Sequence, residues 1–349
     1  MTTTVTALSA ANATAPFEAS SLERRSLRPD DVRIDIAFAG ICHSDIHTVR
    51  EEWGPASFPL TPGHEIVGTV AEVGPEVTRY QVGDRVGVGC FVNSCGECAA
   101  CKDGEEQFCD KGVVGTYNGT DYDGTATQGG YSQGIVVREH FVVRIPDGMD
   151  LAVATPLLCA GITTYSPLRR HHTGPGSKVA IVGMGGLGHV AVKIAAAMGA
   201  EVSVLSRTKA KESDGRAYGA SSYYATADES VFSDLAGTFD LIINTVSADL
   251  PVDAYLGLLG RGGTLVNVGA PSGPQQFGMF SLLTNRRSYS GSMVGGLGET
   301  QEMLDFCAEH GVTSTIELID AADVNAYYEK VVNGDVRYRA VIDVSTIAA

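Results

Sequence analysis

Four cysteines stand close together in one short segment, at a spacing that suits a metal site. The spacing is C-x2-C-x2-C-x7-C, and its members are Cys95, Cys98, Cys101 and Cys109. Four thiolates in one loop can complete a tetrahedral shell with no position open for a substrate, so segment 90-112 predicts a structural zinc site. An iron–sulfur cluster would favour a C-x3-C-P ending, whereas Asp110 follows the last cysteine here. Buried cysteines without a metal are the remaining alternative.

Other residues that bind metals or transfer protons are scattered over three further segments. The segments GICHSDIH, PGHE and LLCAG contain Cys42, Ser44, Asp45, His47, His64, Glu65 and Cys159. The sequence alone does not bring these segments together in space. A single buried cysteine or histidine more often serves packing or a hydrogen bond than a metal, so each segment is a modest signal when taken alone.

A glycine-rich segment has the pattern of a dinucleotide-binding turn. Gly183, Gly185 and Gly188 form G-x-G-x-x-G directly after the apolar run KVAIV. The apolar residues that follow recur at helical spacing, and they are Leu187, Val190, Ala191, Ile194, Ala195 and Met198. A strand, a tight turn and a helix in this order place a pyrophosphate at the helix N-terminus. A glycine-rich turn without a ligand is the alternative, but the complete strand, turn, helix and strand favour the dinucleotide.

The end of the next apolar run, EVSVLS, indicates which dinucleotide is bound. NAD sites place an Asp or Glu about 20 residues after the glycines, where it binds the adenosine ribose. This chain has Ser206, Arg207 and Lys211 there instead. Hydroxyls and cations suit a 2′-phosphate, which an acidic residue would repel. Ordinary surface charges are the alternative, but cations clustered in an otherwise acidic chain favour NADP.

The pattern of apolar runs along the chain predicts two domains that must position these residues. Short Val/Ile runs separated by Gly and Pro precede about residue 150 and predict a mostly β domain. From Lys178 onward, apolar runs alternate with helical stretches, which predicts a doubly wound parallel sheet and an α/β fold. We expect a catalytic domain over 1-155, an NADP-binding domain over 156-291, and a return to the catalytic domain over 292-349.

Composition narrows the classes of partner and the location. The chain has 349 residues and a formal net charge of -16. Nucleic acids and anionic membranes are bound mainly through Lys and Arg, so an acidic chain argues against both partners. The N-terminus lacks a basic region and a long apolar run, which is unlike a signal peptide. We therefore expect a cytoplasmic protein with reduced thiols, which leaves metal binding as the leading role of its eight cysteines.

One further motif connects the scattered residues with a known family. The pattern G-H-E-x2-G-x5-G-x2-V is complete in Gly63, His64, Glu65, Gly68, Gly74 and Val77. Together with the four-cysteine segment and the glycine turn, it makes the whole chain resemble the zinc-dependent medium-chain dehydrogenase/reductase superfamily. The details GICHSDIHTVREEWG, LLCAGITTYSPL and SRTKAK are most similar to the cinnamyl alcohol dehydrogenase branch, particularly its bacterial NADP-dependent members. The resemblance implies a Rossmann domain together with a mostly β, GroES-like catalytic domain.

The resemblance also implies a catalytic zinc site. Cys42, His64 and Cys159 would bind the metal and leave its fourth position open for water or substrate. Glu65 would approach the metal when that fourth position changes. Asp45 would orient a ligand histidine from outside the metal's own shell.

The resemblance extends to a proton relay and to the cofactor. Ser44 and His47 match the family's relay positions, through which a proton would reach the reacting oxygen. The family's cofactor contacts correspond here to Thr163, Gly186, Leu187, Gly269, Ser292, Met293 and Val294. Arg207 replaces the second serine of the plant pattern SSSxxK, which leaves its role toward the 2′-phosphate open. Cys90 and Cys307 match no ligand position, and we interpret them as structural.

The expected function is an oxidoreductase that interconverts primary alcohols and aldehydes, aromatic or medium-chain, with NADP(H) and two zinc ions per chain, favouring aldehyde reduction. Trp53 and Phe58 could line an apolar substrate pocket or simply pack the β domain. An NAD-dependent polyol or secondary-alcohol dehydrogenase is the first alternative. A non-catalytic zinc- or nucleotide-binding protein is less favoured, because it predicts a lost ligand and Cys42, His64 and Cys159 are all present. We expect a homodimer, with a tetramer as the alternative.

Overall fold

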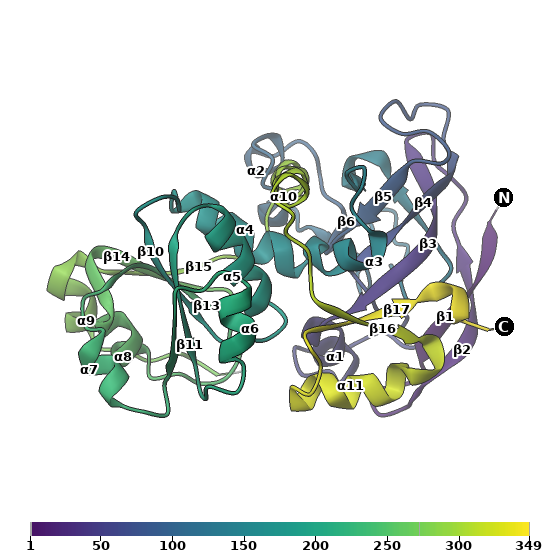
Figure 1. Ribbon diagram of the computed structural model, residues 1–349. Coiled ribbons are helices and arrows are strands. Elements are labelled where there is room, and N and C mark those ends of the chain that lie inside the picture. The colour runs from purple at the N-terminus through teal and green to yellow at the C-terminus, as the bar shows by residue number, and fades with distance from the viewer. Residues whose placement is uncertain (1, 272, 349) are drawn as a thin grey trace. The chain divides into compact units, whose positions relative to one another are not determined.

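The computed structural model describes residues 2–271 and 273–348, which divide into two compact units (Figure 1). Unit 1 comprises Met1–Cys159, Gly295–Glu309 and Thr313–Ala349, and unit 2 comprises Ala160–Val294 and His310–Val312. The chain therefore leaves unit 1 after Cys159 and returns to it at Gly295. The domain boundaries predicted from the sequence, after residues 155 and 291, lie a few residues before these two positions.

Unit 1 is built mainly from β-strands. Its strands are β1 (Thr3–Ala10), β2 (Phe17–Arg24), β3 (Asp31–Ile41), β4 (Ile66–Val73), β5 (Arg85–Val88), β6 (Phe91–Asn93), β7 (Val114–Gly115), β8 (Gly134–Arg138), β9 (Val143–Arg144), β16 (Ile316–Asp320) and β17 (Arg339–Asp343). Its α-helices are α1 (His43–Val49), α2 (Ala99–Lys102), α3 (Leu151–Ala154), α10 (Leu297–Glu309) and α11 (Val324–Asn333). The main sheet has the order β16-β17-β3-β4-β5-β9, with β8 also paired to β3.

Strand β3 is the centre of this sheet and leads directly into the zinc-ligand candidates. Its apolar residues Val32, Ile34 and Ile36 are buried and alternate with more exposed Arg33 and Asp35, which is the period of two that a strand requires. The strand pairs antiparallel with β4, β8 and β17, which come from distant parts of the chain. Its C-terminal end is therefore held on both sides.

Unit 2 contains a six-stranded sheet in which every neighbouring pair is parallel. Its strands are β10 (Lys178–Val182), β11 (Glu201–Ser206), β12 (Ser222–Ala225), β13 (Phe239–Asn244), β14 (Leu259–Asn267) and β15 (Ser288–Gly291). Its α-helices are α4 (Ala160–Arg170), α5 (Gly188–Ala197), α6 (Glu212–Ala217), α7 (Ser230–Asp234), α8 (Val252–Gly257) and α9 (Met279–Leu283). The order β12-β11-β10-β13-β14-β15 is that of a dinucleotide-binding doubly wound sheet, so the predicted fold class is confirmed.

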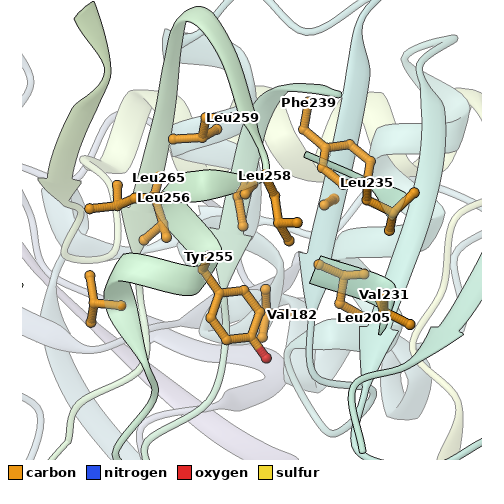
Figure 2. Close-up of a cluster of buried hydrophobic side chains, with 13 residues drawn as sticks. Val182, Leu205, Val231, Leu235, Phe239, Tyr255, Leu256, Leu258, Leu259 and Leu265 are labelled. Carbon is orange, nitrogen blue, oxygen red and sulfur yellow. The ribbon is translucent and has the colours of Figure 1, made fainter. Parts of the chain in front are cut away.

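An apolar cluster packs on one region of this sheet and holds its strands in register (Figure 2). It joins Val182 of β10 and Leu205 of β11 to Leu256 of α8, and all three are at most 2% exposed. Phe239 and Tyr255 fill the space between these elements. Burial of one such side chain stabilises the fold by about 1.5–3 kcal/mol. The cluster therefore fixes the strand ends that carry the cofactor candidates.

Membrane-spanning helices were sought among the described residues. No single helix there is both long and apolar enough to cross a bilayer. The bent pair 151–158 and 160–170 meets the requirement together by length and composition, but most of its residues are buried within the protein.

Candidate functional site

Four residues from three distant segments meet in one buried cluster of unit 1. The ligand atoms of Cys42, His64, Glu65 and Cys159 all lie within 4.8 Å of one another. Cys42 precedes α1 at the end of β3, and Cys159 follows the 3-10 helix Thr155–Leu158. The loop before β4 carries His64 and Glu65. The tertiary fold thus brings together the ligand set that the resemblance implies.

The donor set and its spacing fit zinc. The Sγ atoms of Cys42 and Cys159 are 4.0 Å apart. Two thiolates on one tetrahedral zinc would be separated by roughly 3.8 Å, given a Zn–S bond of about 2.3 Å. A hydrogen bond from Cys159 holds the pKa of the Cys42 thiol well below its usual range, while burial opposes this and Arg339 reinforces it. One thiolate is therefore already favoured, as metal binding requires.

Asp45 supports the ligand histidine from α1. Its Oδ1 lies 2.9 Å from His64 Nδ1 and accepts a hydrogen bond from the backbone N of Gly63 at 3.2 Å. Burial alone would lower the pKa of His64, but the Asp45 carboxylate and nearby thiolates outweigh it and raise this pKa well above its usual range. Because the Asp45 contact occupies Nδ1, Nε2 is the nitrogen that remains to bind zinc.

An arginine that the sequence did not point to completes the cluster. Arg339 of β17 makes a fully buried ion pair with Glu65. The pairing of Ala340 with Ile41 in the sheet places this arginine beside Cys42. Burial and the Cys42 thiolate raise the pKa of Glu65 to about 8, although Arg339 opposes the rise. The one available signal was an arginine opening the apolar run RAVID.

Glu65 has an acceptor atom that suits a cation. Its Oε2 is buried and has no hydrogen-bond partner among the described residues. The neighbouring Gly40 has no side chain because a Cβ there would lie 2.0 Å from this oxygen. A buried, unsatisfied carboxylate oxygen is costly without a partner. A zinc ion in the cluster would supply that partner.

The predicted relay residues lie on the same helix, and one of them has an additional partner. No hydrogen bond joins Ser44 to His47 in the described part of the chain; instead, His47 Nδ1 contacts the Glu52 carboxylate. His47 Nε2 is buried and unpaired. Trp53, a predicted substrate residue, stacks on the His47 ring at 4.7 Å and is 51% exposed. Phe58, the other one, is half-buried.

Cys90 lies nearer to this cluster than its interpretation as a structural residue suggests. This half-buried residue hydrogen-bonds to Cys159 through its thiol, which lowers the pKa of Cys90 although desolvation opposes the change. It is nevertheless outside the group of four mutually close ligand atoms. Cys307, in α10, packs near the Met303 sulfur at 3.7 Å, as expected of a structural cysteine.

The four-cysteine segment forms a second candidate zinc site. The Sγ atoms of its members lie within 4.8 Å of one another, and those of Cys95 and Cys101 are 3.8 Å apart. Two hydroxyl groups border these sulfurs: Ser94 Oγ is 3.2 Å from Cys101 and Tyr122 Oη is 3.7 Å from Cys109. Four thiolates that converge on one point fit a closed structural zinc site.

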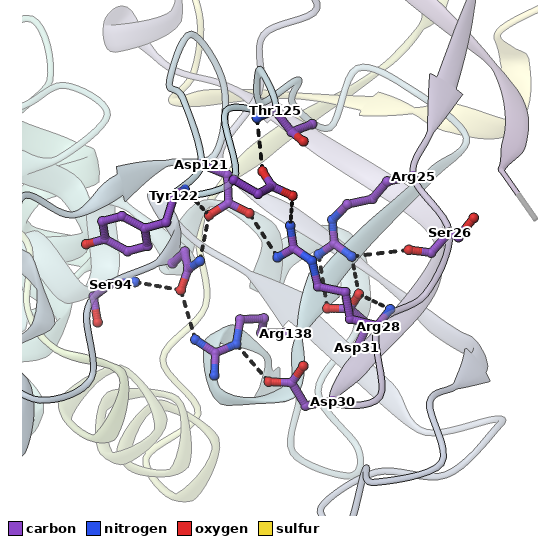
Figure 3. Close-up of polar contacts among 12 residues, drawn as sticks. Arg25, Ser26, Arg28, Asp30, Asp31, Ser94, Asp121, Tyr122, Thr125 and Arg138 are labelled. Carbon is purple, nitrogen blue, oxygen red and sulfur yellow. Dashed lines mark hydrogen bonds and ion pairs between the residues drawn. The ribbon is translucent and has the colours of Figure 1, made fainter.

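A polar network anchors this loop to the rest of unit 1 (Figure 3). Arg138 pairs with Asp30 at 2.8 Å and donates to Asn93 Oδ1, which also accepts from the backbone N of Ser94. Asp121, which precedes Tyr122, pairs with Arg28 at 3.0 Å. The residues before and after the zinc loop are therefore held by charge-assisted hydrogen bonds.

The glycine turn of unit 2 is shaped for a pyrophosphate. Gly183 has a φ of 93°, which disfavours any side chain there. A Cβ on Gly188 would lie 2.1 Å from the Gly183 carbonyl oxygen, so glycine lets α5 approach β10. A Cβ on Gly185 would meet nothing within 4 Å, which leaves the space that a phosphate needs. Gly186 and Leu187 complete the turn before α5.

The cations predicted to bind the 2′-phosphate gather after β11. Ser206 ends this strand, and Arg207 beside it is exposed. Lys211 Nζ donates to the carbonyl of Met184 at 3.1 Å, which brings the ammonium group to the glycine turn itself. Lys211 is thus hydrogen-bonded to the glycine turn that is shaped for the pyrophosphate.

The remaining predicted cofactor residues also lie in unit 2. A Cβ on Gly269 would lie 2.2 Å from the Val246 carbonyl oxygen, so this loop after β14 requires glycine. Ser292 donates its backbone N–H to Asn267 O at 3.1 Å, directly after β15. Thr163 is buried in α4. Met293 is 52% exposed, and Val294 has a φ of 44°.

Comparison with known proteins gives matches over nearly the whole chain. The family model "Alcohol dehydrogenase GroES-like domain" matches residues 28–147, and "Zinc-binding dehydrogenase" matches residues 186–346. A probable formaldehyde dehydrogenase of Bacillus subtilis (strain 168) is 61% identical over 340 residues, covering 97% of each chain. The NADP-dependent alcohol dehydrogenase C 1 of Mycolicibacterium smegmatis is 59% identical over 345 residues, covering 99% of each.

A solved structure matches the fold equally well. The cinnamyl alcohol dehydrogenase of Helicobacter pylori, complexed with NADP(H), superposes with a TM-score of 0.93. It is 41% identical in sequence, and the match covers 99% of both chains.

Proposed function

We propose, from the premise that this chain belongs to the zinc-dependent alcohol dehydrogenases, that it acts chiefly as an NADPH-dependent reductase of aromatic or medium-chain aldehydes. Its general activity is that of an oxidoreductase that interconverts alcohols and aldehydes with NADP(H) and zinc. The single observation that carries the site assignment is the buried group of Cys42, His64, Glu65 and Cys159.

The residues of this site divide the chemical work. When bound, zinc supplies Lewis-acid polarisation of the carbonyl oxygen, and NADPH supplies the hydride. Cys42, His64 and Cys159 would hold the metal, and Asp45 would orient His64 through the contact with Nδ1. Three protein ligands of this kind are typical of catalytic rather than structural zinc sites.

His47 and Glu52 form the candidate proton path. The Glu52 carboxylate holds His47 by Nδ1 and is 47% exposed, so it connects the imidazole with solvent. His47 Nε2 is the ring atom left to exchange a proton with a bound hydroxyl group. Ser44 contributes a hydroxyl group to the path, and its Oγ lies 3.7 Å from Cys42 Sγ.

The reductive direction rests on the cofactor. Cells generally hold NADP in its reduced form, and the missing acidic ribose ligand favours NADP over NAD. The experiment compares kcat/KM for benzaldehyde, cinnamaldehyde and hexanal with NADPH against the corresponding alcohols with NADP⁺. We expect higher values for the aldehydes at neutral pH. Faster oxidation of alcohols, or of polyols with NAD⁺, would contradict the proposal.

Arg207→Asp should weaken binding of NADPH far more than binding of NADH. The substitution places a negative charge where the 2′-phosphate would lie, and loss of one charge-assisted contact costs about 1.5–3 kcal/mol. We therefore expect KM for NADPH to rise by at least about tenfold, while KM for NADH changes little. Arg216→Asp, at the far end of α6, is the control. Equal effects on both cofactors would contradict the assignment.

We further infer that the enzyme is a cytoplasmic homodimer. Strand β15 is an edge of the six-stranded sheet, and α9 exposes Met279, Phe280 and Leu283 to 62%, 81% and 63%. An open strand edge with exposed apolar side chains in the same unit favours pairing with a second copy. All eight cysteines are free thiols, which suits a reducing compartment. Light scattering that gives the mass of one chain would refute the dimer, and recovery outside the cytosol would refute the location.

A further inference from the structure

The carboxylate of Asp45 is the junction between the zinc-ligand candidates and a line of buried hydroxyl groups. Asp45 is 0% exposed, and three donors have been located around it. His64 and the backbone of Gly63 contact Oδ1, and the backbone N of Cys42 donates to Oδ2 at 2.9 Å. A buried carboxylate needs several donors to offset its desolvation, and Oδ2 has capacity for one more.

Tyr131 supplies that additional donor. Its hydroxyl donates to Asp45 Oδ2 at 3.3 Å, and the whole residue is 0% exposed. The backbone of Tyr131 is tied to the loop that carries His64, because its N–H donates to Pro62 O at 3.0 Å. A Cβ on Gly63 would lie 2.6 Å from the Tyr131 ring. Glycine before His64 therefore makes room for this tyrosine.

Tyr328 extends the line to the C-terminal part of the chain. Its hydroxyl donates to Tyr131 Oη at 3.4 Å from α11, and it is 5% exposed. Burial and the Asp45 charge raise the pKa of both tyrosines well above their usual range. Both hydroxyls therefore stay protonated and can donate. A donor that itself accepts a hydrogen bond is polarised and becomes stronger.

The surroundings hold both rings in place. The ring of Phe17 packs edge-on against Tyr131 at 5.9 Å and against Tyr328 at 4.8 Å. Helices α1 and α11 lie side by side in Figure 1, and Arg50, the C-cap of α1, pairs with Glu329 of α11 at 2.5 Å. A phenylalanine at either position would keep these ring contacts, so the hydroxyl groups add only the hydrogen bonds of the line.

We propose that Tyr131 and Tyr328 are positioning residues that act through Asp45 and set the donor strength of His64 toward the catalytic zinc. The inference rests on the proposed function, because it requires zinc at the cluster that contains His64. Each hydrogen bond to Asp45 draws charge away from the His64 side. Without the Tyr131 hydroxyl, Asp45 becomes a stronger acceptor, His64 a stronger donor to zinc, and the metal a weaker Lewis acid.

The test uses Tyr131→Phe and Tyr328→Phe in the full chain, with cobalt substituted for zinc. Both variants remove one oxygen and keep the ring, so Phe17 retains its contacts. We expect the visible absorption bands of cobalt at the catalytic site to shift in Tyr131→Phe. A smaller shift in the same direction is expected for Tyr328→Phe. The double variant should show the same shift as Tyr131→Phe alone, because Tyr328 acts through the Tyr131 hydroxyl. Bands absent from Cys159→Ala are those of the catalytic site.

Steady-state kinetics provide the second readout. We expect kcat in Tyr131→Phe to fall by about threefold to tenfold, less than the 10–100-fold typical of a residue that contacts the ligand directly. KM for NADPH should not change. Tyr80→Phe is the matched control, since its buried hydroxyl donates to Val142 O outside the line. It should lower stability without changing the cobalt bands or kcat.

The cobalt spectrum separates the possible outcomes. Unshifted bands in Tyr131→Phe would overturn the inference, whatever happens to kcat, and so would an equal shift in Tyr80→Phe. A wild-type chain that binds a single metal ion, and still binds it in Cys159→Ala, would instead overturn the proposed catalytic site. The experiment therefore distinguishes failure of the proposed role of Tyr131 and Tyr328 from failure of the proposed function.

Discussion

Replacing Cys159 by alanine should leave a folded chain that binds one zinc ion and has almost no activity. The cluster keeps one thiolate, one imidazole and the Glu65 carboxylate that pairs with Arg339, and this weaker donor set should not hold zinc against buffer. Loss of the Lewis acid removes several kcal/mol of transition-state stabilisation, and about 4 kcal/mol corresponds to about a thousandfold in rate. We therefore expect kcat to fall by at least that factor. Metal analysis, circular dichroism and turnover with NADPH measure the three parts of this prediction.

The contrasting variant is Cys98→Ala in the four-cysteine loop. It should also bind one zinc ion per chain, but its main effect should be on thermal stability, because a closed four-thiolate site contributes to folding and has no open position. Near-normal activity of Cys159→Ala would show that the catalytic assignment is wrong. Activity lost in both variants, without a difference in stability, would contradict the division into one catalytic and one structural site.

Much of the fold could be predicted because its signals are local. Gly183, Gly185 and Gly188 follow one another at short, fixed intervals in the sequence. The apolar face of the helix that follows is fully buried, as its spacing predicts, at Val190, Ala191, Ile194 and Ala195. Turn chemistry and helical periodicity depend only on neighbours in the sequence. The four-cysteine site has the same character, since one loop of 15 residues holds every ligand.

The catalytic cluster could not be derived in this way. Cys42 and Cys159 are 117 positions apart, and their approach depends on the pairing of whole strands. The resemblance named these ligands, but composition and spacing did not. Arg339 escaped notice because it lies 274 positions from Glu65, and an arginine at the start of a strand normally suggests an exposed position. Only the pairing of β17 with β3 reveals it.

The relay prediction illustrates an intermediate case. Ser44 and His47 were named by their match to the family's relay positions, and both lie on α1. The sequence did not show that Glu52, just beyond the helix, would bind His47 Nδ1. The chain reverses direction after α1 through Glu51, whose φ is 57°, and this turn brings Glu52 back toward the helix. A left-handed glutamate has no distinct sequence signal.

The buried pair of Glu65 and Arg339 should show an asymmetry between its two partners. Glu65→Gln leaves a buried guanidinium that cannot lose its proton, and breaking a buried pair costs about 3–5 kcal/mol of unfolding free energy. Arg339→Met leaves a carboxyl whose pKa is already raised to about 8 and which can become neutral. Its cost should be smaller, on the order of 1–3 kcal/mol.

Chemical denaturation at pH 9, above the Glu65 pKa of about 8, measures these costs, and the double variant provides the control. Removal of both partners leaves no uncompensated charge, so Glu65→Gln/Arg339→Met should be more stable than Glu65→Gln alone. The non-additivity should reach at least about 1 kcal/mol, since the two groups are in direct contact. A smaller cost for Glu65→Gln than for Arg339→Met would mean that the cluster's thiolates, rather than Glu65, balance the arginine. Arg339 would then be tied to zinc binding through Cys42 and Cys159, whose thiolates also favour its charge.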